Sequence, residues 1–355
     1  MNELTKVFHH QSPLGDKLVC YFTQDPICNR LPTKNGQKET EKATLQFFLP
    51  MTSEGNEAKA MIKKIQSKIN PAYTVAFAQV TKPMKGISLI ITYDPKKITC
   101  NYESFDAINT HKGLIFSFHN KEILQQLKLK TDGLLQYACN NPSTKPRIML
   151  DYGHGGSDDG KVGCFNVKEK DINLEVGRRV SRLLSHKGYE VFSTRTRDCF
   201  VALDERTRNA NQKKVDLFVS IHANSAHKSE IQGIETYWMN YDLFKPGMSL
   251  SDASDFALLN MLKHARSTNS QKLASLIHEH VIQATKKVHN TVDRKVKQSV
   301  AQVLLGSEMP SALIEIGFLS NPEETKLLAD HYYQQIVAQG IASGIIAYLT
   351  MRKIA

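Results

Sequence analysis

The chain has 355 residues, a net charge of +11 and a pI near 9.2, with 41% apolar and 23% charged residues. These values are ordinary for a globular protein and suggest two domains, and no apolar run is long enough to span a membrane. The charge favours polyanionic surroundings, but the lysines are scattered and no nucleic-acid motif is present, so we expect no nucleic-acid partner. The first 15 residues are polar, so we expect that a signal peptide is absent or was removed.

Six cysteines stand at positions 20, 28, 100, 139, 164 and 199, and no two have the CxxC spacing of zinc ribbons or thioredoxin-like motifs. An even number permits disulfides in an oxidising compartment, but a chain of this length does not need them. We therefore expect most of the cysteines to be buried thiols.

The first 140 residues are typical of a small β-rich α+β domain, because several short segments are rich in aromatic and β-branched residues. Strands are predicted at 17–23, 44–49, 73–79, 86–93, 98–102 and 113–118, and a helix is predicted at 56–70. The pair His9 and His10 could suggest a metal site, but adjacent side chains rarely converge and we expect this end of the chain to be loose.

Residues 141–146 have the composition of a linker, so we place the domain boundary there and assign 147–355 to a second domain. This part alternates predicted strands (147–152, 190–195, 215–224, 233–239, 301–305 and 311–318) with predicted helices (171–187, 203–213, 252–264, 271–288 and 332–351). Residues 240–270 are otherwise expected to be irregular. The alternation predicts an α/β fold with a mostly parallel, twisted sheet flanked by helices.

Ligand-capable side chains follow or end two of the buried strands. His154 comes directly after the strand at 147–152, His222 lies near the end of the strand at 215–224, and Glu169 precedes the helix at 171–187. In open α/β sheets, ligands collect beyond the carboxyl ends of the strands. Two imidazoles and one carboxylate with an open fourth position form a catalytic zinc set, and such a zinc lowers the pKa of its bound water to roughly 7.

Glu315 lies in the apolar strand at 311–318, where a buried charge is costly unless it is paired or neutralised. Functional carboxylates occupy such positions, so we assign Glu315 as the group that takes the proton from water and passes it to the leaving amine. The alternative is a structural glutamate that is hydrogen-bonded to backbone amides.

Four other residues could be taken for metal ligands: His278, His280, Asp151 and Asp171. His278 and His280 are two residues apart on a predicted helix, so they do not face each other and lack the HExxH spacing of zinc proteases. Asp151 and Asp171 are reserve ligands, and we favour roles in which they orient a histidine.

Four motifs in this order resemble the zinc-dependent N-acetylmuramoyl-L-alanine amidases of bacterial cell walls. The family pattern Asp-x-Gly-His-Gly-Gly is matched at 151–156, Glu-Lys-Asp-x-Asn-Leu at 169–174, Ser-Ile-His-Ala-Asn at 220–224, and Glu-x-Gly-Phe-Leu-Ser-Asn at 315–321. The resemblance covers residues 147–350, and one departure is Tyr152, where the family often has proline. It implies one catalytic zinc held by His154, Glu169 and His222, with Glu315 as the catalytic glutamate.

The resemblance further implies cleavage of the amide between N-acetylmuramic acid and L-alanine in peptidoglycan, during cell-wall remodelling, cell separation or division. It also implies a periplasmic or cell-envelope location. In some relatives the segment equivalent to 240–270 carries an autoinhibitory helix, so we expect a lid or an activator-docking surface there, or a plain surface excursion. The N-terminal domain is a candidate for wall targeting. Two alternatives stay open: a zinc peptidase that cuts within the stem peptide, and a non-catalytic peptidoglycan-binding or activator protein.

Overall fold

The computed structural model describes residues 2–11, 15–22, 29–31, 43–50, 52–54, 73–80, 86–93, 97–106, 112–122, 124, 145–240, 245–249 and 253–354. The chain divides into two compact units. The first comprises residues 1–133 and 242–261, and the second comprises residues 134–241 and 262–355. The predicted helix at 56–70 and most of the predicted linker at 141–146 lie outside the described residues.

The described part of the first unit is built from two sheets. One has the strand order β14-β8-β9-β2-β1-β5 and the other has the order β3-β4-β7-β6. Their bounds are β1 Asn2–Gln11, β2 Gly15–Phe22, β3 Asn29–Leu31, β4 Ala43–Pro50, β5 Thr52–Glu54, β6 Tyr73–Val80, β7 Gly86–Tyr93, β8 Ile98–Asp106, β9 Lys112–Asn120 and β14 Lys245–Ser249. The six predicted strands correspond to β2, β4, β6, β7, β8 and β9.

Two features of the first unit differ from the sequence-based expectation. The N-terminal end is not loose, because His9 and His10 lie in β1, where they pair with Leu18 and Lys17 of β2. Part of the segment 240–270 is also regular, since β14 pairs antiparallel with β8 at the edge of the larger sheet. This strand therefore belongs to the first unit, although the chain reaches it from the second.

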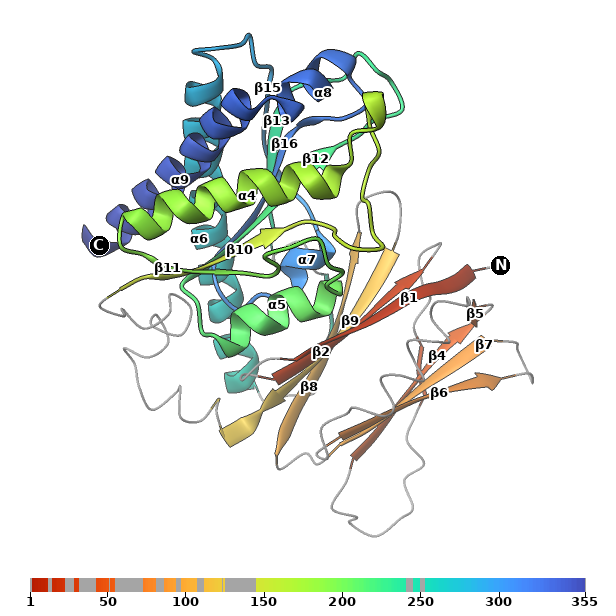
Figure 1. Ribbon diagram of the computed structural model, residues 1–355. Coiled ribbons are helices and arrows are strands. Elements are labelled where there is room, and N and C mark those ends of the chain that lie inside the picture. The colour runs from red at the N-terminus through yellow and green to blue at the C-terminus, as the bar shows by residue number, and fades with distance from the viewer. Residues whose placement is uncertain are drawn as a thin grey trace. The chain divides into compact units, whose positions relative to one another are not determined.

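The second unit contains a six-stranded sheet in the order β11-β10-β12-β16-β13-β15 (Figure 1). The bounds are β10 Arg147–Tyr152, β11 Glu190–Ser193, β12 Leu217–Asn224, β13 Ile234–Trp238, β15 Asp293–Gln298 and β16 Ser311–Phe318. Every neighbouring pair is parallel except β13 and β16, which are antiparallel. This arrangement confirms the predicted mostly parallel sheet flanked by helices.

The helices of the second unit are α4 Glu169–His186, α5 Leu203–Gln212, α7 Gln302–Leu305, α8 Pro322–Ala329, α9 His331–Ile354 and the part of α6 Ala253–Thr285 that begins at Leu262. One apolar core joins α4, α6 and α9 to one face of the sheet, and Figure 1 shows α4 and α9 crossing that face. Gly344 of α9 permits close helix packing, because a Cβ there would lie 2.4 Å from the Cα of Ile277 in α6. The shorter α5 and α7 contact each other, and α7 contacts β16.

Side-chain alternation along the strands separates the apolar core from a polar face. Ile148, Leu150 and Tyr152 of β10 belong to the core shared with α4, α6 and α9, so Met149 and Asp151 point to the opposite face. The same alternation places His222 of β12 on that opposite face, because Ile221 and Ala223 belong to the core. The candidate site is built on this polar face.

Two expectations about the elements differ from the structure. Helices were predicted at 252–264 and 271–288, and most of both ranges is helical, but the break between them is wrong because they belong to one helix, α6. Polar side chains in the intervening stretch are buried, and the Ser270 hydroxyl accepts a hydrogen bond of 3.0 Å from the amide of Ser311. The predicted strand at 301–305 is instead the helical turn α7, followed by Gly306. Strand β15 and helix α8 were not predicted.

Among the described residues, no helix combines the length and the apolar character needed to cross a membrane. Cys20 and Cys100 are buried, whereas Cys164 and Cys199 are partly exposed.

Candidate metal centre

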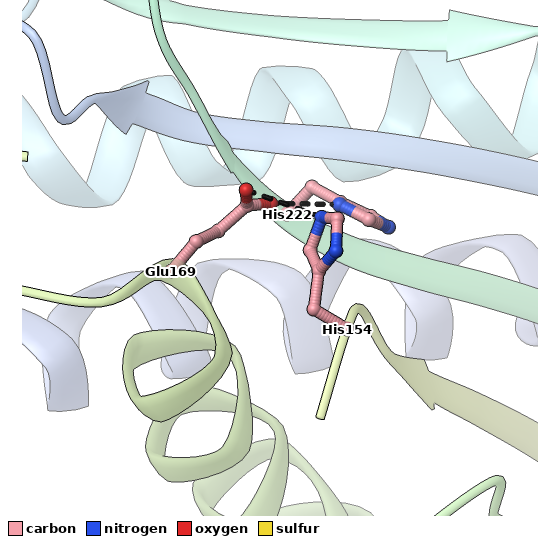
Figure 2. Close-up of side chains that lie close together, drawn as sticks. All are labelled: His154, Glu169 and His222. Atoms are coloured by element: carbon pink, nitrogen blue, oxygen red, sulfur yellow. Dashed lines mark hydrogen bonds and ion pairs between the residues drawn. The ribbon is translucent and has the colours of Figure 1, made fainter. Parts of the chain in front are cut away.

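Three side chains from three separate elements converge at one end of the polar face (Figure 2). His154 follows β10, Glu169 is the first residue of α4, and His222 lies near the end of β12. One potential ligand atom from each residue lies within 4.8 Å of the others. The two imidazole rings are nearly perpendicular, with their centroids 5.0 Å apart.

Glu169 lies at the centre of the cluster and is 2% exposed. Its Oε1 lies 2.8 Å from Nδ1 of His222, and its Oε2 lies 3.2 Å from Nε2 of His154 and accepts the amide of Lys161 at 2.8 Å. Burial alone would raise the pKa of Glu169, but the hydrogen bonds from His154 and His222 outweigh it and hold that pKa far below its usual range. The carboxylate is therefore ionised and ready to bind a cation.

His154 has an unusual backbone conformation, with φ at 62° in the left-handed region. A residue with a Cβ adopts this backbone conformation at a cost of roughly 1–2 kcal/mol, so surrounding contacts must hold His154 in it. Its Nδ1 lies 2.8 Å from Oδ2 of Asp158. Burial lowers the pKa of His154, but the hydrogen bonds to Glu169 and Asp158 produce a net increase.

Two buried arginines hold the turn that carries His154. Arg206 donates from Nη1 to the carbonyl of Tyr152 at 3.0 Å and from Nη2 to the carbonyl of His154 at 3.1 Å. Arg195 donates to the carbonyls of Tyr152 at 2.8 Å and Gly153 at 3.0 Å. These bonds fix three consecutive carbonyls, so they set the direction in which His154 leaves the strand.

Asp151 is fully buried and anchors the same network. It accepts hydrogen bonds from Ser220 at 2.6 Å, Thr194 at 2.7 Å and Arg206 at 2.7 Å. Burial raises the pKa of Asp151, but Arg206 and the two hydroxyl donors outweigh it and lower that pKa overall. Asp151 therefore acts on the histidine turn through Arg206.

Two glycines leave the space that the ligands occupy. A Cβ on Gly153 would lie 2.3 Å from Cε1 of His222, inside the volume of the imidazole. A Cβ on Gly160 would lie 2.7 Å from Oε2 of Glu169 and from Cδ2 of His154. Both positions therefore exclude a larger residue while the ligands keep their positions.

Glu315 of β16 is the register partner of His222 on β12 and of Glu235 on β13. Neighbouring strands are about 4.8 Å apart, so the three side chains form a row across the polar face. The Oε2 atom of Glu315 is buried and has no hydrogen-bond partner among the described residues. Burial raises the pKa of Glu315 well above its usual range, and the charges of Glu169 and Glu235 raise it further.

The row continues into a second polar cluster around Glu235, which is 2% exposed. Its Oε1 accepts from Asn224 at 2.8 Å and from the hydroxyl of Tyr237 at 2.6 Å. Its Oε2 accepts from Nε of Arg294 at 3.0 Å and from Nζ of Lys297. Burial raises the pKa of Glu235, but Lys297, Tyr237 and Arg294 lower it overall.

The structure brings His154, Glu169, His222 and Glu315 together and places the other candidates elsewhere. His278 is buried against Thr236 and Asp293, at 3.0 and 2.9 Å, and belongs to the packing of α6. Asp171 is exposed on α4. Asp158, which contacts His154, was not predicted, and its position four residues after that histidine was the only signal in the sequence.

The donor set fits a divalent cation such as zinc. Two imidazoles and one ionised carboxylate lie close enough to share one ion, and Asp158 orients His154 from behind as carboxylates commonly do for metal-binding histidines. Thiolate ligands, which are typical of structural zinc, are not part of this described cluster.

Comparisons with known proteins agree on one family. Residues 148–347 match the family Amidase_3, described as N-acetylmuramoyl-L-alanine amidase. N-acetylmuramoyl-L-alanine amidase AmiC of Neisseria meningitidis is 33% identical over 224 residues, which cover 58% of this chain and 53% of that protein. N-acetylmuramoyl-L-alanine amidase AmiA of Escherichia coli K12 is 30% identical over 252 residues, covering 66% of this chain and 87% of that protein.

Among solved structures, N-acetylmuramoyl-L-alanine amidase AmiC2 of Nostoc punctiforme is 30% identical, covering 58% of this chain and 97% of that one, with a TM-score of 0.47. This chain therefore spans only about half of the Neisseria relative but most of the Escherichia relative. The family match covers more than half of the chain and includes every element of the candidate metal centre. The chain belongs to the N-acetylmuramoyl-L-alanine amidase family.

Proposed function

We propose that this protein is a zinc-dependent amidase that hydrolyses the bond between N-acetylmuramic acid and L-alanine in peptidoglycan. The observation that carries the proposal is the convergence of His154, Glu169 and His222 beside Glu315, in a chain of the N-acetylmuramoyl-L-alanine amidase family. The relatives' names state the bond that they act on, and the proposal transfers that bond to this chain.

In this proposal His154, Glu169 and His222 hold one zinc ion. Bound zinc supplies Lewis-acid chemistry, because it polarises a carbonyl oxygen and makes water more acidic. Glu315 moves the proton: its carboxylate takes a proton from the attacking water and returns it to the nitrogen of the departing L-alanine. Within the part of the chain that the structure describes, Oε2 of Glu315 has no hydrogen-bond partner. This supports the role, since a purely structural glutamate would have its buried oxygens hydrogen-bonded.

The proposal places the protein in the bacterial cell envelope, in the periplasm where one exists, because peptidoglycan lies there. It keeps residues 1–140 as a wall-targeting domain, joined through 141–146 to the catalytic domain at 147–355. Sedimentation of the full chain with peptidoglycan, compared with a chain lacking residues 1–140, tests the targeting role. Equal sedimentation of the two would contradict it.

We also propose that residues 240–270 respond to a protein activator. The support is that this segment leaves the amidase sheet and contributes β14 to the first unit before it returns as α6. Any deletion within 240–270 that tests this role should keep Arg266, because this buried side chain donates to the carbonyl of Ser307 at 2.9 Å. Replacing 245–249 with a flexible Gly-Ser segment is the sharper change: higher activity supports a regulatory segment, and unchanged activity opposes it.

The amidase function is tested by incubating the zinc-loaded full chain with purified peptidoglycan, with and without a zinc chelator, and weighing the released fragments by mass spectrometry. Free stem peptides that begin with L-alanine and appear only with metal are expected. Stems shortened at an internal bond would show a peptidase instead. No release by folded, zinc-loaded protein, alone and with the 245–249 replacement, would favour a binding protein.

A further inference from the structure

The polar row beside Glu315 ends in two cations that the proposed hydrolysis does not use. Arg294 and Lys297 lie on the edge strand β15, and both contact the same oxygen, Oε2 of Glu235. The other oxygen of Glu235 is already bound by Asn224 and Tyr237. Neutralising one buried carboxylate needs one cation, so the pair has capacity for a second anion.

Both cations can be reached from solvent. The side chain of Arg294 is 31% exposed and that of Lys297 is 38% exposed, while Glu235 beneath them is almost fully covered. The carboxylate therefore fixes the cations from below and leaves their outer sides open.

Arg294 is also oriented before any ligand arrives. Its Nε donates to Glu235, and its guanidinium carbon lies 4.9 Å from the centroid of the Phe318 ring. Its terminal nitrogens Nη1 and Nη2 have no hydrogen-bond partner among the described residues. A planar guanidinium with two free parallel N–H groups is suited to bind a carboxylate in a bidentate manner.

The distance from Glu315 to this guanidinium is close to the length of two peptide residues. Glu315 and Glu235 are directly opposite on neighbouring strands, about 4.8 Å apart, and the hydrogen bond to Arg294 adds 3.0 Å. The carboxylate of Glu315 would therefore lie roughly 8 Å from Nε of Arg294. Two extended residues span about 7 Å, and a hydrogen bond at each end adds about 3 Å, so a stem peptide whose scissile nitrogen contacts Glu315 can place the α-carboxylate of its second residue against Arg294.

We propose that Arg294 and Lys297 form a carboxylate-binding subsite that recognises the free α-carboxylate of the acidic residue following L-alanine. The inference rests on the proposed amidase function, because that function places the departing L-alanine beside Glu315. Arg294 and Lys297 bind the substrate and determine specificity, while Glu235 positions them.

The test compares two soluble substrates and needs no mutation. They are N-acetylmuramoyl-L-alanyl-D-glutamate and its α-amide, N-acetylmuramoyl-L-alanyl-D-isoglutamine, which differ only in the charge at the proposed contact. The zinc-loaded full chain should have a kcat/KM about 10- to 100-fold lower for the amide, the usual range for losing a charge-assisted hydrogen bond. A tripeptide substrate that is amidated only on its third residue should show no decrease in kcat/KM, because the carboxylate of that residue is not the one proposed to contact Arg294 and Lys297.

Variants then assign the effect to residues. Arg294→Gln and Lys297→Met should each reduce the preference for the charged substrate, and Arg294→Lys should restore it only in part, because lysine lacks the guanidinium fork. Lys295→Met is the matched control: it removes a charge from the same strand, but its side chain is 76% exposed and pairs with Asp293. The control should keep the full preference.

Binding provides a readout that is independent of catalysis. L-alanyl-D-glutamate and L-alanyl-D-isoglutamine are titrated into the zinc-loaded chain and followed by NMR, and tighter binding of the charged dipeptide is expected in wild type and not in Arg294→Gln. Equal kcat/KM for both substrates would overturn the subsite while leaving the amidase function intact. Cleavage of neither substrate would count against the amidase function, and equal binding of the two dipeptides would then overturn the subsite as well.

Discussion

The buried ion pair beneath the histidine turn gives the sharpest prediction about stability. The side chains of Arg206 and Asp151 are 3% and 0% exposed, and their atoms are 2.7 Å apart. Arg206→Met leaves Asp151 as an uncompensated buried charge, so we expect the free energy of unfolding to fall by about 3–5 kcal/mol. Arg208→Met is the matched control on the same helix, because Arg208 pairs with Asp204 at a more exposed position and should cost below about 1 kcal/mol.

The protein contains a single tryptophan, Trp238, which is 5% exposed in β13. Urea unfolding followed by its fluorescence therefore reports on the amidase sheet. A second change tests the cause: Asp151→Asn removes the buried charge but keeps one acceptor oxygen, which can serve one of the two hydroxyls that donate to Oδ2 (Ser220) and Oδ1 (Thr194). We expect the double variant with Arg206→Met to recover roughly 2 kcal/mol relative to Arg206→Met alone.

Metal affinity should not recover in parallel. The double variant still lacks the two bonds from Arg206 to the carbonyls of Tyr152 and His154, so competition with a chelator should show weaker zinc binding than in wild type, by roughly 10- to 100-fold. The reasoning is refuted if Arg206→Met costs no more than Arg208→Met, or if Asp151→Asn recovers no stability.

Two further predictions follow from buried groups near the sheet. Glu324 is 4% exposed and accepts the amides of Phe318 at 2.7 Å and Gly233 at 2.8 Å, and burial raises its pKa from 4.5 to about 7. The contribution of Glu324 to the free energy of unfolding is complete below pH 4.5 and is lost as pH rises through 7, a decrease of roughly 3 kcal/mol. Urea unfolding as a function of pH should show this decrease in wild type and not in Glu324→Gln. The same pH dependence in the variant would contradict this. Gly153→Ala should weaken zinc binding by roughly 10- to 100-fold, because the new Cβ would overlap the His222 ring, and unchanged zinc affinity would show that the ring can move without cost.

The strands that carry the candidate ligands were predictable because each is a continuous apolar run. β10, β12 and β16 are buried on both faces, so their sequences are apolar except where a polar side chain ends or interrupts the run. His154 follows the β10 run, His222 lies near the end of β12, and Glu315 interrupts β16. Parallel strands bring equivalent ends to one edge, so the sequence alone could place the three together.

The elements that were missed or misassigned depend on partners distant in sequence. β15 reads DRKVKQ and has no apolar run, because it is an edge strand whose cations pair with Glu235 on the neighbouring strand. The polar residues within α6 look like a helix break in the sequence, because the sequence does not show that the Ser270 hydroxyl accepts from the distant amide of Ser311. By contrast, α8 did have a local signal: Asn321 caps it and Pro322 occupies its first turn.

The supporting network of the site was equally hidden. Arg195 donates to the carbonyl of Tyr152, 43 residues earlier, and Arg206 donates to the carbonyl of His154, 52 residues earlier. Hydrogen bonds between residues so far apart produce no periodic pattern in the sequence. Asp151 was predicted to orient a histidine, and in the structure its side chain accepts hydrogen bonds from Ser220, Thr194 and Arg206. The ligands follow from strand ends, whereas the groups that hold them follow only from the fold.

The most direct test of the proposed mechanism measures zinc content and turnover together in wild type, His222→Ala and Glu315→Gln. We expect wild type to bind one zinc per chain and release stem peptides, and His222→Ala to lose both metal and activity. Glu315→Gln should keep its zinc and lose turnover by at least about 100-fold, since it removes only the group that moves the proton. Turnover by zinc-loaded Glu315→Gln at the wild-type rate, or full zinc content in active His222→Ala, would contradict the assignment.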